Sequence, residues 1–182
     1  QEPNPIPGRH ETIFPMFEFE APGHIEDLKD LEIDLLKWLG FSDPVACDYE
    51  DWCAKFEVED GELTAEHENK MGEEYGACLI ENFPNYTSPF WNMKQNDEGT
   101  HAKKIDVILG GMETIGSAER STDPDQMMKM FHEISDGGYA QLLFDKFGKD
   151  RVEKELDEFL NHKFIARYGG GIGITRLISA LK

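Results

Sequence analysis

The sequence predicts an α+β fold in which an antiparallel β-sheet of short strands is flanked by helices. Two observations favour strands: side chains alternate in character over residues 12–20, and a tight turn at Gly110-Gly111 separates two further strand-like runs. A third observation concerns topology, because the helical stripes do not alternate with strands as a parallel sheet requires. The 182 residues suffice for one domain with a sizeable core.

Acidic residues dominate the charged composition. The chain has 37 Asp and Glu against 18 Lys and Arg, a formal net charge of −19. Such a surface repels nucleic-acid phosphates unless basic residues cluster, and Lys103-Lys104 is the only adjacent basic pair. Cys47, Cys53 and Cys78 lack metal-type spacing and indicate free thiols in a reducing, cytoplasmic compartment. We expect no membrane partner, because no apolar run approaches the roughly eighteen residues of a membrane span.

The strand expected at residues 12–20 follows a proline-rich loop and divides its side chains between two faces. Two carboxylates beside a phenylalanine would suit a cation, an ammonium group or an aromatic ring. An ordinary amphipathic strand with a wet polar side is a competing interpretation. Pro15 indicates a sheet edge or a bulge. The expected core face holds Ile13, Pro15, Phe17 and Phe19, and the polar face holds Phe14, Met16, Glu18 and Glu20.

Helical stripes and caps predict most of the remaining elements. A stripe of leucine and isoleucine ends at Gly40, and Asp123-Pro124 is a typical helix start. A strand around Cys78-Leu79-Ile80 leads into a turn. The predicted helices cover residues 24–39, 49–56, 63–76, 123–134, 139–147 and 150–161.

The hairpin that turns at Gly110-Gly111 carries two carboxylates. Asp106 lies in its first strand and Glu113 in its second, and such a pair suits magnesium with bridging phosphates. Arg120 follows Glu113 by seven residues, an odd separation that puts it on the opposite face of a regular strand. It shares the site only if a bulge intervenes, which Gly116 would permit.

A glycine-rich stretch near the end of the sequence predicts a strand that turns into a helix. Gly169, Gly170, Gly171 and Gly173 precede a helical pattern that contains Arg176. Glycines let the backbone lie against a ligand, and the helix start adds N–H donors and a fixed positive charge for a phosphate. A strand–turn–helix packing unit with a solvated arginine explains the pattern equally well. The dinucleotide spacing G-x-G-x-x-G is absent.

Taken in order, these features resemble the catalytic domain of class II aminoacyl-tRNA synthetases of the aspartate, asparagine and lysine subclass. They also resemble the asparagine synthetases that descend from that domain. Gly8-Arg9-His10 with residues 14–20 is similar to the second class II motif, and residues 170–177 are similar to the third. The spacing of Glu113 and Arg120 is typical of members that handle aspartate or asparagine. The run at residues 88–91 and the glycine-rich ending resemble archaeal-type and A-type asparagine synthetases.

The resemblance implies ATP and Mg²⁺ as cofactors and a role for each motif residue. The carboxylates of the hairpin would hold magnesium, and the arginines would bind phosphates or a substrate carboxylate. The implied catalytic residues are Arg9, His10 and Arg176; the implied ATP-binding residues are Glu2, Phe14, Gly171, Gly173 and Arg176; the implied substrate-binding residues are Glu18, Ser117 and Arg120; and the implied metal ligands are Asp106 and Glu113.

The sequence departs from the family pattern at three places. The second motif normally places an arginine two positions before a glutamate, and if Glu2 is that glutamate its arginine would precede Gln1. The first motif, a dimer-interface helix and strand, is absent. The link between Arg167-Tyr168 and the glycines lacks the proline-containing segment that is usual in the family, so one expectation is that residues are missing near Gly169. We therefore expect residues 1–182 to form a class II catalytic domain without its N-terminal part.

The function expected from the resemblance is ATP-dependent activation of aspartate as an acyl-adenylate. Ammonia would then amidate it to asparagine, with release of AMP and pyrophosphate by a homodimeric ligase. The strongly acidic charge favours this hypothesis. One alternative is the catalytic domain of an asparaginyl- or aspartyl-tRNA synthetase, for which tRNA is a partner. Another is a non-catalytic paralogue. The sequence leaves open which carboxylate of aspartate is activated.

Overall fold

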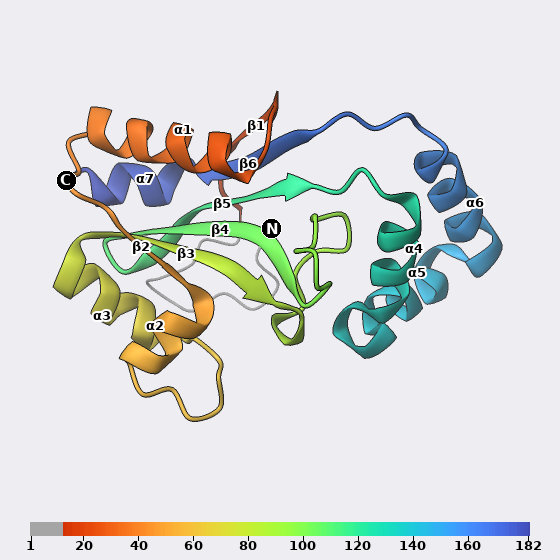
Figure 1. Ribbon diagram of the computed structural model, residues 1–182, viewed down its shortest axis with the longest axis horizontal. Helices are drawn as coiled ribbons and strands as arrows, with labels where there is room; N and C mark the ends of the chain where they lie inside the picture. The colour runs from red at the N-terminus through yellow and green to blue at the C-terminus, as the bar shows by residue number, and fades with distance from the viewer. Residues whose placement is uncertain (1–12) are drawn as a thin grey trace.

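The computed structural model describes residues 13–182 and shows a six-stranded sheet in the order β1-β6-β5-β4-β3-β2 (Figure 1). All neighbouring strands pair antiparallel except β2 and β3, which pair parallel. This arrangement confirms the predicted α+β class. The strands are β1 (Met16–Pro22), β2 (Val45–Asp48), β3 (Ala77–Pro84), β4 (His101–Leu109), β5 (Met112–Arg120) and β6 (Arg167–Gly173).

Helices cover the sheet unevenly. One pair packs on one face, a second pair covers the β2–β4 part of the other face, and three helices form a lobe beside the sheet (Figure 1). Each predicted helix is present within a few residues of its expected bounds. In that order the groups are α1 (Ile25–Trp38) with α7 (Ile174–Ala180), α2 (Tyr49–Lys55) with α3 (Ala65–Tyr75), and α4 (Pro124–Glu133) with α5 (Gly138–Phe147) and α6 (Lys149–Leu160); short 3₁₀ turns are η1 (Asn85–Thr87) and η2 (Ile134–Gly137).

Local sequence signals explain where the elements begin and turn. The Asp123 carboxylate accepts hydrogen bonds from the backbone N–H groups of Asp125 and Gln126, so it caps α4. Gly110 and Gly111 have φ angles of 55° and 79°, the left-handed values that a two-residue turn between right-twisted strands requires. Both glycines therefore fix the β4–β5 hairpin that the sequence predicted.

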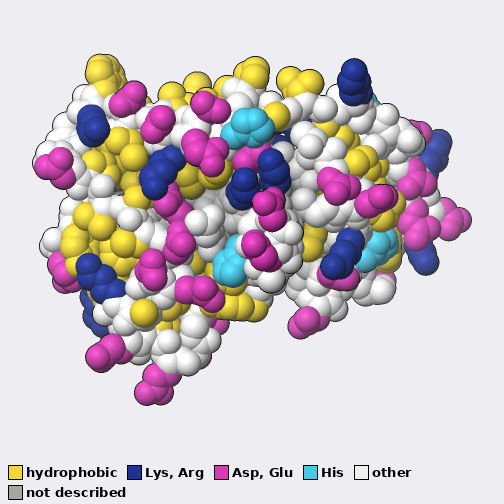
Figure 2. Space-filling view, in the orientation of Figure 1, with side chains coloured by type: hydrophobic (Ala, Val, Ile, Leu, Met, Phe, Trp, Pro, Cys, Tyr) yellow, Lys and Arg dark blue, Asp and Glu magenta, His cyan; other side chains and the backbone are white. Residues whose placement is uncertain are grey.

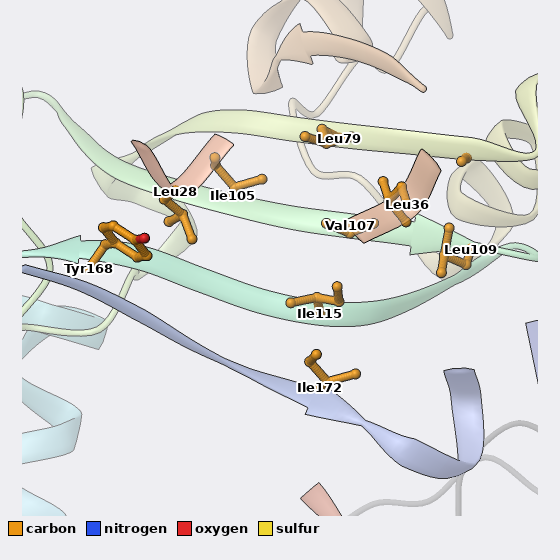
Figure 3. Close-up of a cluster of buried hydrophobic side chains, with 10 residues drawn as sticks. Leu28, Leu36, Leu79, Ile105, Val107, Leu109, Ile115, Tyr168 and Ile172 are labelled. Carbon is orange, nitrogen blue, oxygen red and sulfur yellow. The ribbon is translucent and has the colours of Figure 1, made fainter. Parts of the chain in front are cut away.

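The main core lies between the sheet and the helix pair α1 and α7. Leu28 and Leu36 of α1 pack against alternate residues of the central strands (Figure 3). A second core lies on the opposite face, where Trp52 and Met71 cover β3 and β4. The same face of β1, β6 and β5 carries the cavity described below, beside the part of the sheet that α2 and α3 cover.

One expectation about the core is wrong, and one strand was missed. Ile13 and Phe17, expected in the core, are 83% and 58% exposed, because β1 is an edge strand and only Phe19 of that face packs on the core. The short strand β2 was not predicted. Its four residues are too few for a clear alternation, and α2 and α3 carry the chain from it to its parallel partner β3.

Candidate active site

The floor of the site is a row of register partners on the uncovered half of the sheet. Glu18 of β1 lies opposite Gly171 of β6, which lies opposite Gly116 of β5, and Gly116 lies opposite Asp106 of β4. A Cβ atom on Gly116 would lie 2.8 Å from Oε1 of Glu113 and 3.5 Å from Oδ1 of Asp106. The two glycines therefore leave a bare floor between carboxylates.

A cavity of about 550 Å³ stands on this floor. This volume is within the range of small-molecule sites. Residues from three neighbouring strands and from the start of α7 line it. Of the sequence-predicted site residues, the cavity brings together Phe14, Glu18, Glu113, Arg120, Gly171, Gly173 and Arg176, and it adds Met16, Phe19, Glu20, Thr114, Gly116 and Gly170.

A β-bulge explains how Glu113 and Arg120 reach the same cavity. Val107 pairs with Ile115, whereas the next residue, Ile108, pairs with Glu113, so Thr114 is an extra residue in β5. The extra residue reverses the alternation of side chains. This confirms the bulge that the odd spacing required, at Thr114 instead of at Gly116.

Asp106 and Glu113 form an electrostatically strained pair. Asp106 lines a second cavity of about 700 Å³, where its Oδ2 accepts a hydrogen bond from Lys104. Its Oδ1 is buried and has no partner within residues 13–182. Burial raises the pKa of Asp106, and Lys104 offsets part of that rise. The charge of Asp106, followed by burial, raises the pKa of Glu113 to about 7.

This pair fits a magnesium ion that ATP also ligates. A cation near the unpartnered Oδ1 would relieve the repulsion between the two carboxylates. The described part of the chain contains no group of three or more His, Cys, Asp or Glu side chains that could hold a metal ion. Magnesium commonly takes one or two carboxylates together with substrate phosphates and water, so the two carboxylates suffice only with a bound nucleotide.

Arg176 is held at the other side of the floor. It lies in the first turn of α7, which begins directly after β6, and its Nη1 donates to the Glu113 carbonyl oxygen at 2.5 Å. The N–H of Ile174 donates to the carbonyl oxygen of Pro15 at 3.1 Å and joins the start of α7 to the approach of β1. The guanidinium is therefore fixed beside the carboxylates.

Three charged side chains form a cluster at the opposite end of the cavity, where Glu20 and Arg120 line it and Arg167 contacts Glu20 from beside it. Nε of Arg120 donates to Oε1 of Glu20 at 3.0 Å, and Nε of Arg167 lies 3.4 Å from Oε2 of the same carboxylate. Arg120 and Arg167 are register partners on β5 and β6. No site role was expected for Arg167, and Glu20 was expected only on a strand face that would suit a cation, an ammonium group or an aromatic ring. Alternation along the glycine-rich strand was the available signal, because residues 167, 169, 171 and 173 share one face.

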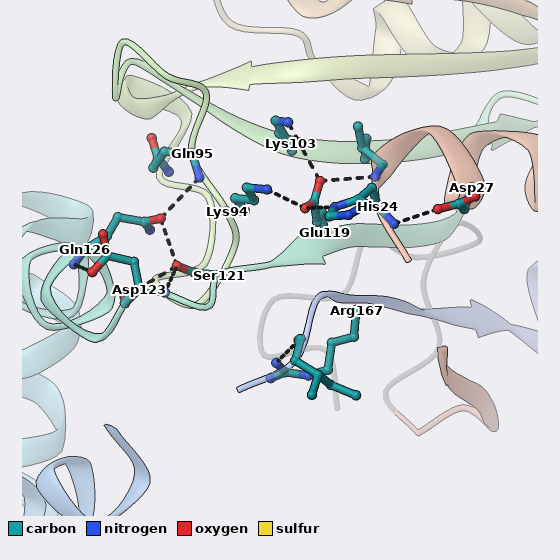
Figure 4. A network of polar contacts seen from close by, with 12 residues as sticks. His24, Asp27, Lys94, Gln95, Lys103, Glu119, Ser121, Asp123, Gln126 and Arg167 are labelled. Carbon is teal, nitrogen blue, oxygen red and sulfur yellow. Dashed lines mark hydrogen bonds and ion pairs between the residues drawn. The ribbon is translucent and has the colours of Figure 1, made fainter. Parts of the chain in front are cut away.

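A buried network anchors the strand segment that carries Arg120. Glu119 accepts hydrogen bonds from Lys94 at 2.7 Å and from the N–H of Ile25 at 3.1 Å, and His24 Nδ1 lies 2.9 Å away (Figure 4). Burial pushes the pKa of Glu119 upward, but the hydrogen bonds from Lys94 and His24 outweigh it and lower the pKa. The network ties the start of α1 to β5 next to Arg120.

Ser117 is turned away from the cavity, which corrects the substrate-binding position expected for it. It follows Gly116 by one residue, so its hydroxyl points toward α1, 2.7 Å from Glu32 Oε1 and 3.2 Å from the Ile105 carbonyl oxygen. Burial raises the pKa of Glu32, the partner of Ser117 on α1, to about 8. The Ser117 hydroxyl has one proton to donate and two acceptors within reach, Glu32 Oε1 and the Ile105 carbonyl oxygen. Glu2, Arg9 and His10 lie outside the described residues.

Comparison with known protein families assigns most of the chain. A family model described as tRNA synthetases class II (D, K and N) matches residues 23–182. A comparison with curated protein sequences returns no match. No helix in residues 13–182 is long and apolar enough to cross a membrane.

Solved structures with the same fold include synthetases for aspartate and asparagine. The aspartyl tRNA synthetase from Entamoeba histolytica has a TM-score of 0.75 at 18% identity, covering 100% of this chain and 43% of that chain. The asparaginyl-tRNA synthetase from Pyrococcus horikoshii, complexed with asparaginyl-adenylate, has a TM-score of 0.72 at 20% identity. The match covers 95% of this chain and 45% of that chain. The present chain thus spans less than half the length of these proteins.

Proposed function

Because the chain belongs to the class II tRNA synthetase family for D, K and N, we propose that it activates aspartate with ATP as an acyl-adenylate and then amidates it with ammonia. The observation that carries this proposal is a cavity with a glycine floor that is lined by Glu113 and by two arginines, Arg120 and Arg176, with Asp106 in register beside Gly116 of that floor. A carboxylate oxygen of aspartate attacks the α-phosphorus of ATP, and pyrophosphate leaves. Ammonia then attacks the acyl carbon, and AMP leaves with the electron pair of the broken C–O bond.

The proposed reaction depends on positioned charges more than on proton transfer. Phe14 would stack on adenine above the glycine floor, and Arg176 would bind the outer phosphate. Asp106 and Glu113 would hold magnesium, which would neutralise phosphate charge. Arg120 would bind the carboxylate of aspartate that is not activated, and Glu18 would receive its ammonium group.

The tRNA-charging alternative rests on the names of the similar structures, aspartyl- and asparaginyl-tRNA synthetases. The charge of the chain favours free ammonia as the acceptor. The whole chain carries a net charge of −19, and on the face seen in Figure 2 the acidic side chains are widely spread and outnumber the Lys and Arg side chains. An extended polyanion such as tRNA is repelled by such a surface.

We also propose a homodimer that uses the exposed hydrophobic side chains on the outer surface of α1 and β1. Hydrophobic side chains gather along the upper edge of the view in Figure 2, where these elements lie. Trp38 is 82% exposed, Phe17 58% and Leu31 43%. Sedimentation equilibrium of the wild type and of Trp38→Glu tests this, because a charge in the interface should shift the mass toward the monomer. An unchanged mass distribution would count against this interface.

The experiment that tests the reaction follows ATP consumption by the full-length protein with aspartate, with and without ammonium. We expect asparagine, AMP and pyrophosphate to appear together without tRNA. Aspartate-dependent exchange of pyrophosphate into ATP without asparagine, followed by charging of added tRNA, would move the protein to the tRNA-charging class. Absence of exchange with every amino acid would support the non-catalytic alternative.

A further inference from the structure

The arginine end of the cavity has a charge balance that depends on one residue outside the expected site. Arg120 and Glu20 face each other across β5, β6 and β1 and sum to zero charge. Arg167 brings the cluster to +1, and it lies on the same face as Arg120 because the two are register partners. If this end of the cavity had no net charge, it would not favour a ligand's carboxylate over a carboxamide. A net positive charge at this end does favour the carboxylate.

The geometry leaves part of the arginine cluster open to a ligand. Glu20 Oε1 accepts a hydrogen bond from Nε of Arg120, and Glu20 Oε2 forms an ion pair with Nε of Arg167. Within residues 13–182, no hydrogen bond forms at the terminal amino groups of Arg120. The side chain of Arg167 is 23% exposed, and its guanidinium is steadied by the Phe164 ring at 5.4 Å. Glu20 thus holds the planar guanidinium of Arg120, which lines the cavity, and pairs with Arg167 beside it, whose Nη1 donates to the Ile165 carbonyl oxygen.

We propose that Arg167 is a specificity-determining residue that gives this end of the cavity the net positive charge with which it selects a dicarboxylic amino acid. The substrate places its unactivated carboxylate against Arg120, and Arg167 supplies the charge that Glu20 would otherwise cancel. An amino acid in which that carboxylate is an amide is rejected. The proposal rests on the proposed function for its substrate, and it adds the residue and the charge count that make the selection.

The test changes the net charge of the cluster by substitution and measures the equilibrium binding of amino acids to each full-length variant. Aspartate, its β-amide asparagine and its α-amide isoasparagine are titrated calorimetrically in the presence of a non-hydrolysable ATP analogue. The variants are Arg167→Gln with a cluster charge of zero, and Arg167→Gln combined with Glu20→Gln, which returns the cluster to +1. The matched control is Arg151→Gln, because Arg151 on α6 pairs with Glu155 at 2.8 Å on an exposed surface.

We expect the wild type and Arg151→Gln to reject one of the two amides by at least about tenfold, the factor typical of one charge-assisted contact. The amide that is rejected identifies the carboxylate that faces the arginines. Arg167→Gln should weaken aspartate by at least about tenfold and leave the binding of that amide and of the ATP analogue within about twofold. The double variant should regain most of the discrimination.

Three results would overturn the inference. In the first, Arg167→Gln prefers aspartate over the amide as strongly as Arg151→Gln does. In the second, Arg167→Gln binds aspartate and the amide more weakly by the same factor, as a purely structural role predicts. In the third, the double variant is as unselective between aspartate and the amide as Arg167→Gln. A wild type that binds neither aspartate nor its amides overturns this inference and the proposed substrate together. The expected binding pattern without any pyrophosphate exchange leaves the inference standing and refutes only the proposed reaction.

Discussion

Gly170 and Gly171 are neighbours in β6, yet alanine at each should damage a different property of the protein. A Cβ on Gly170 would lie 2.6 Å from Cβ of Ser117 and 2.8 Å from the carbonyl oxygen of Gly116, which are atoms of the adjacent strand. A Cβ on Gly171 would meet only Cε of Met16, at 2.7 Å. The Gly170 contacts are with the backbone of a paired strand and with a Cβ fixed to it, whereas the Gly171 contact is with the end of a flexible side chain.

The size of the two effects follows from these contacts. Overpacking costs typically about 1–3 kcal/mol, and Gly170→Ala should reach the upper end because β6 is paired on both sides. The melting temperature should then fall by roughly 6–12 °C. Gly171→Ala should cost less than about 1 kcal/mol, because Met16 is 46% exposed and can turn away. Its methyl group raises the floor of the cavity, so the KM for ATP should rise by at least about tenfold.

Thermal unfolding and pyrophosphate exchange on the same preparations measure the two properties. Gly138→Ala is the matched control, because Gly138 has helical φ and ψ angles of −62° and −33° and its Cβ would lie an ordinary 3.9 Å from Cβ of Ser135. It should leave both properties unchanged. Equal losses of stability in the two β6 variants, or an unchanged KM for ATP in Gly171→Ala, would refute the assignment of these glycines to opposite faces of the strand.

Three further substitutions test the charged groups. Arg176→Ala should reduce aspartate-dependent pyrophosphate exchange by at least about a thousandfold, and near-normal exchange would contradict its placement at the phosphates. Asp106→Asn should raise the magnesium concentration needed for half-maximal exchange by at least about tenfold, and an unchanged requirement would remove it from the metal site. In the wild type, the Glu32 carboxyl keeps its proton up to about pH 8 only when the protein is folded, so the free energy of unfolding should fall by on the order of 4 kcal/mol between about pH 4.5 and 8. Glu32→Gln should remove this fall. Urea unfolding at pH 5 and pH 8 measures it, and an equal change in the free energy of unfolding for both proteins would refute the reasoning.

The sequence carried enough information to predict the fold because its strongest signals are local. A capped helix start at Asp123 and a two-glycine turn at Gly110-Gly111 depend on neighbours in the chain alone. Exposure depends on distant partners, which explains the error at Phe17. Its alternation with Phe19 is real, but only the three-dimensional sheet order reveals that β1 is an edge strand.

Site residues that belong to a sequence motif could be predicted. Residues whose place in the site depends on how neighbouring strands pair were harder to predict. Glu113 and Arg120 share the cavity because of one extra residue at Thr114, and no local signal shows where a bulge will form. Ser117 was misplaced because alternation beyond the bulge turns it toward Glu32. Arg167 was missed because its importance arises from lying opposite Arg120 on another strand, 47 residues away in sequence.

The charge distribution of the chain favours ammonia over tRNA as the acceptor of the activated aspartate, and the salt dependence of tRNA binding tests this. Three arginines of an acidic chain, Arg120, Arg167 and Arg176, lie at or beside one cavity, so a small anion such as ATP meets positive charge within the site. A tRNA would also have to cross the outer surface, where repulsion is screened over about 8 Å at physiological salt. Ordinary tRNA binding weakens as salt rises. Binding of tRNA to this acidic surface should instead be absent at low salt, and a steep fall in tRNA affinity between about 50 and 200 mM salt would show a basic tRNA surface that the charge of this chain does not provide.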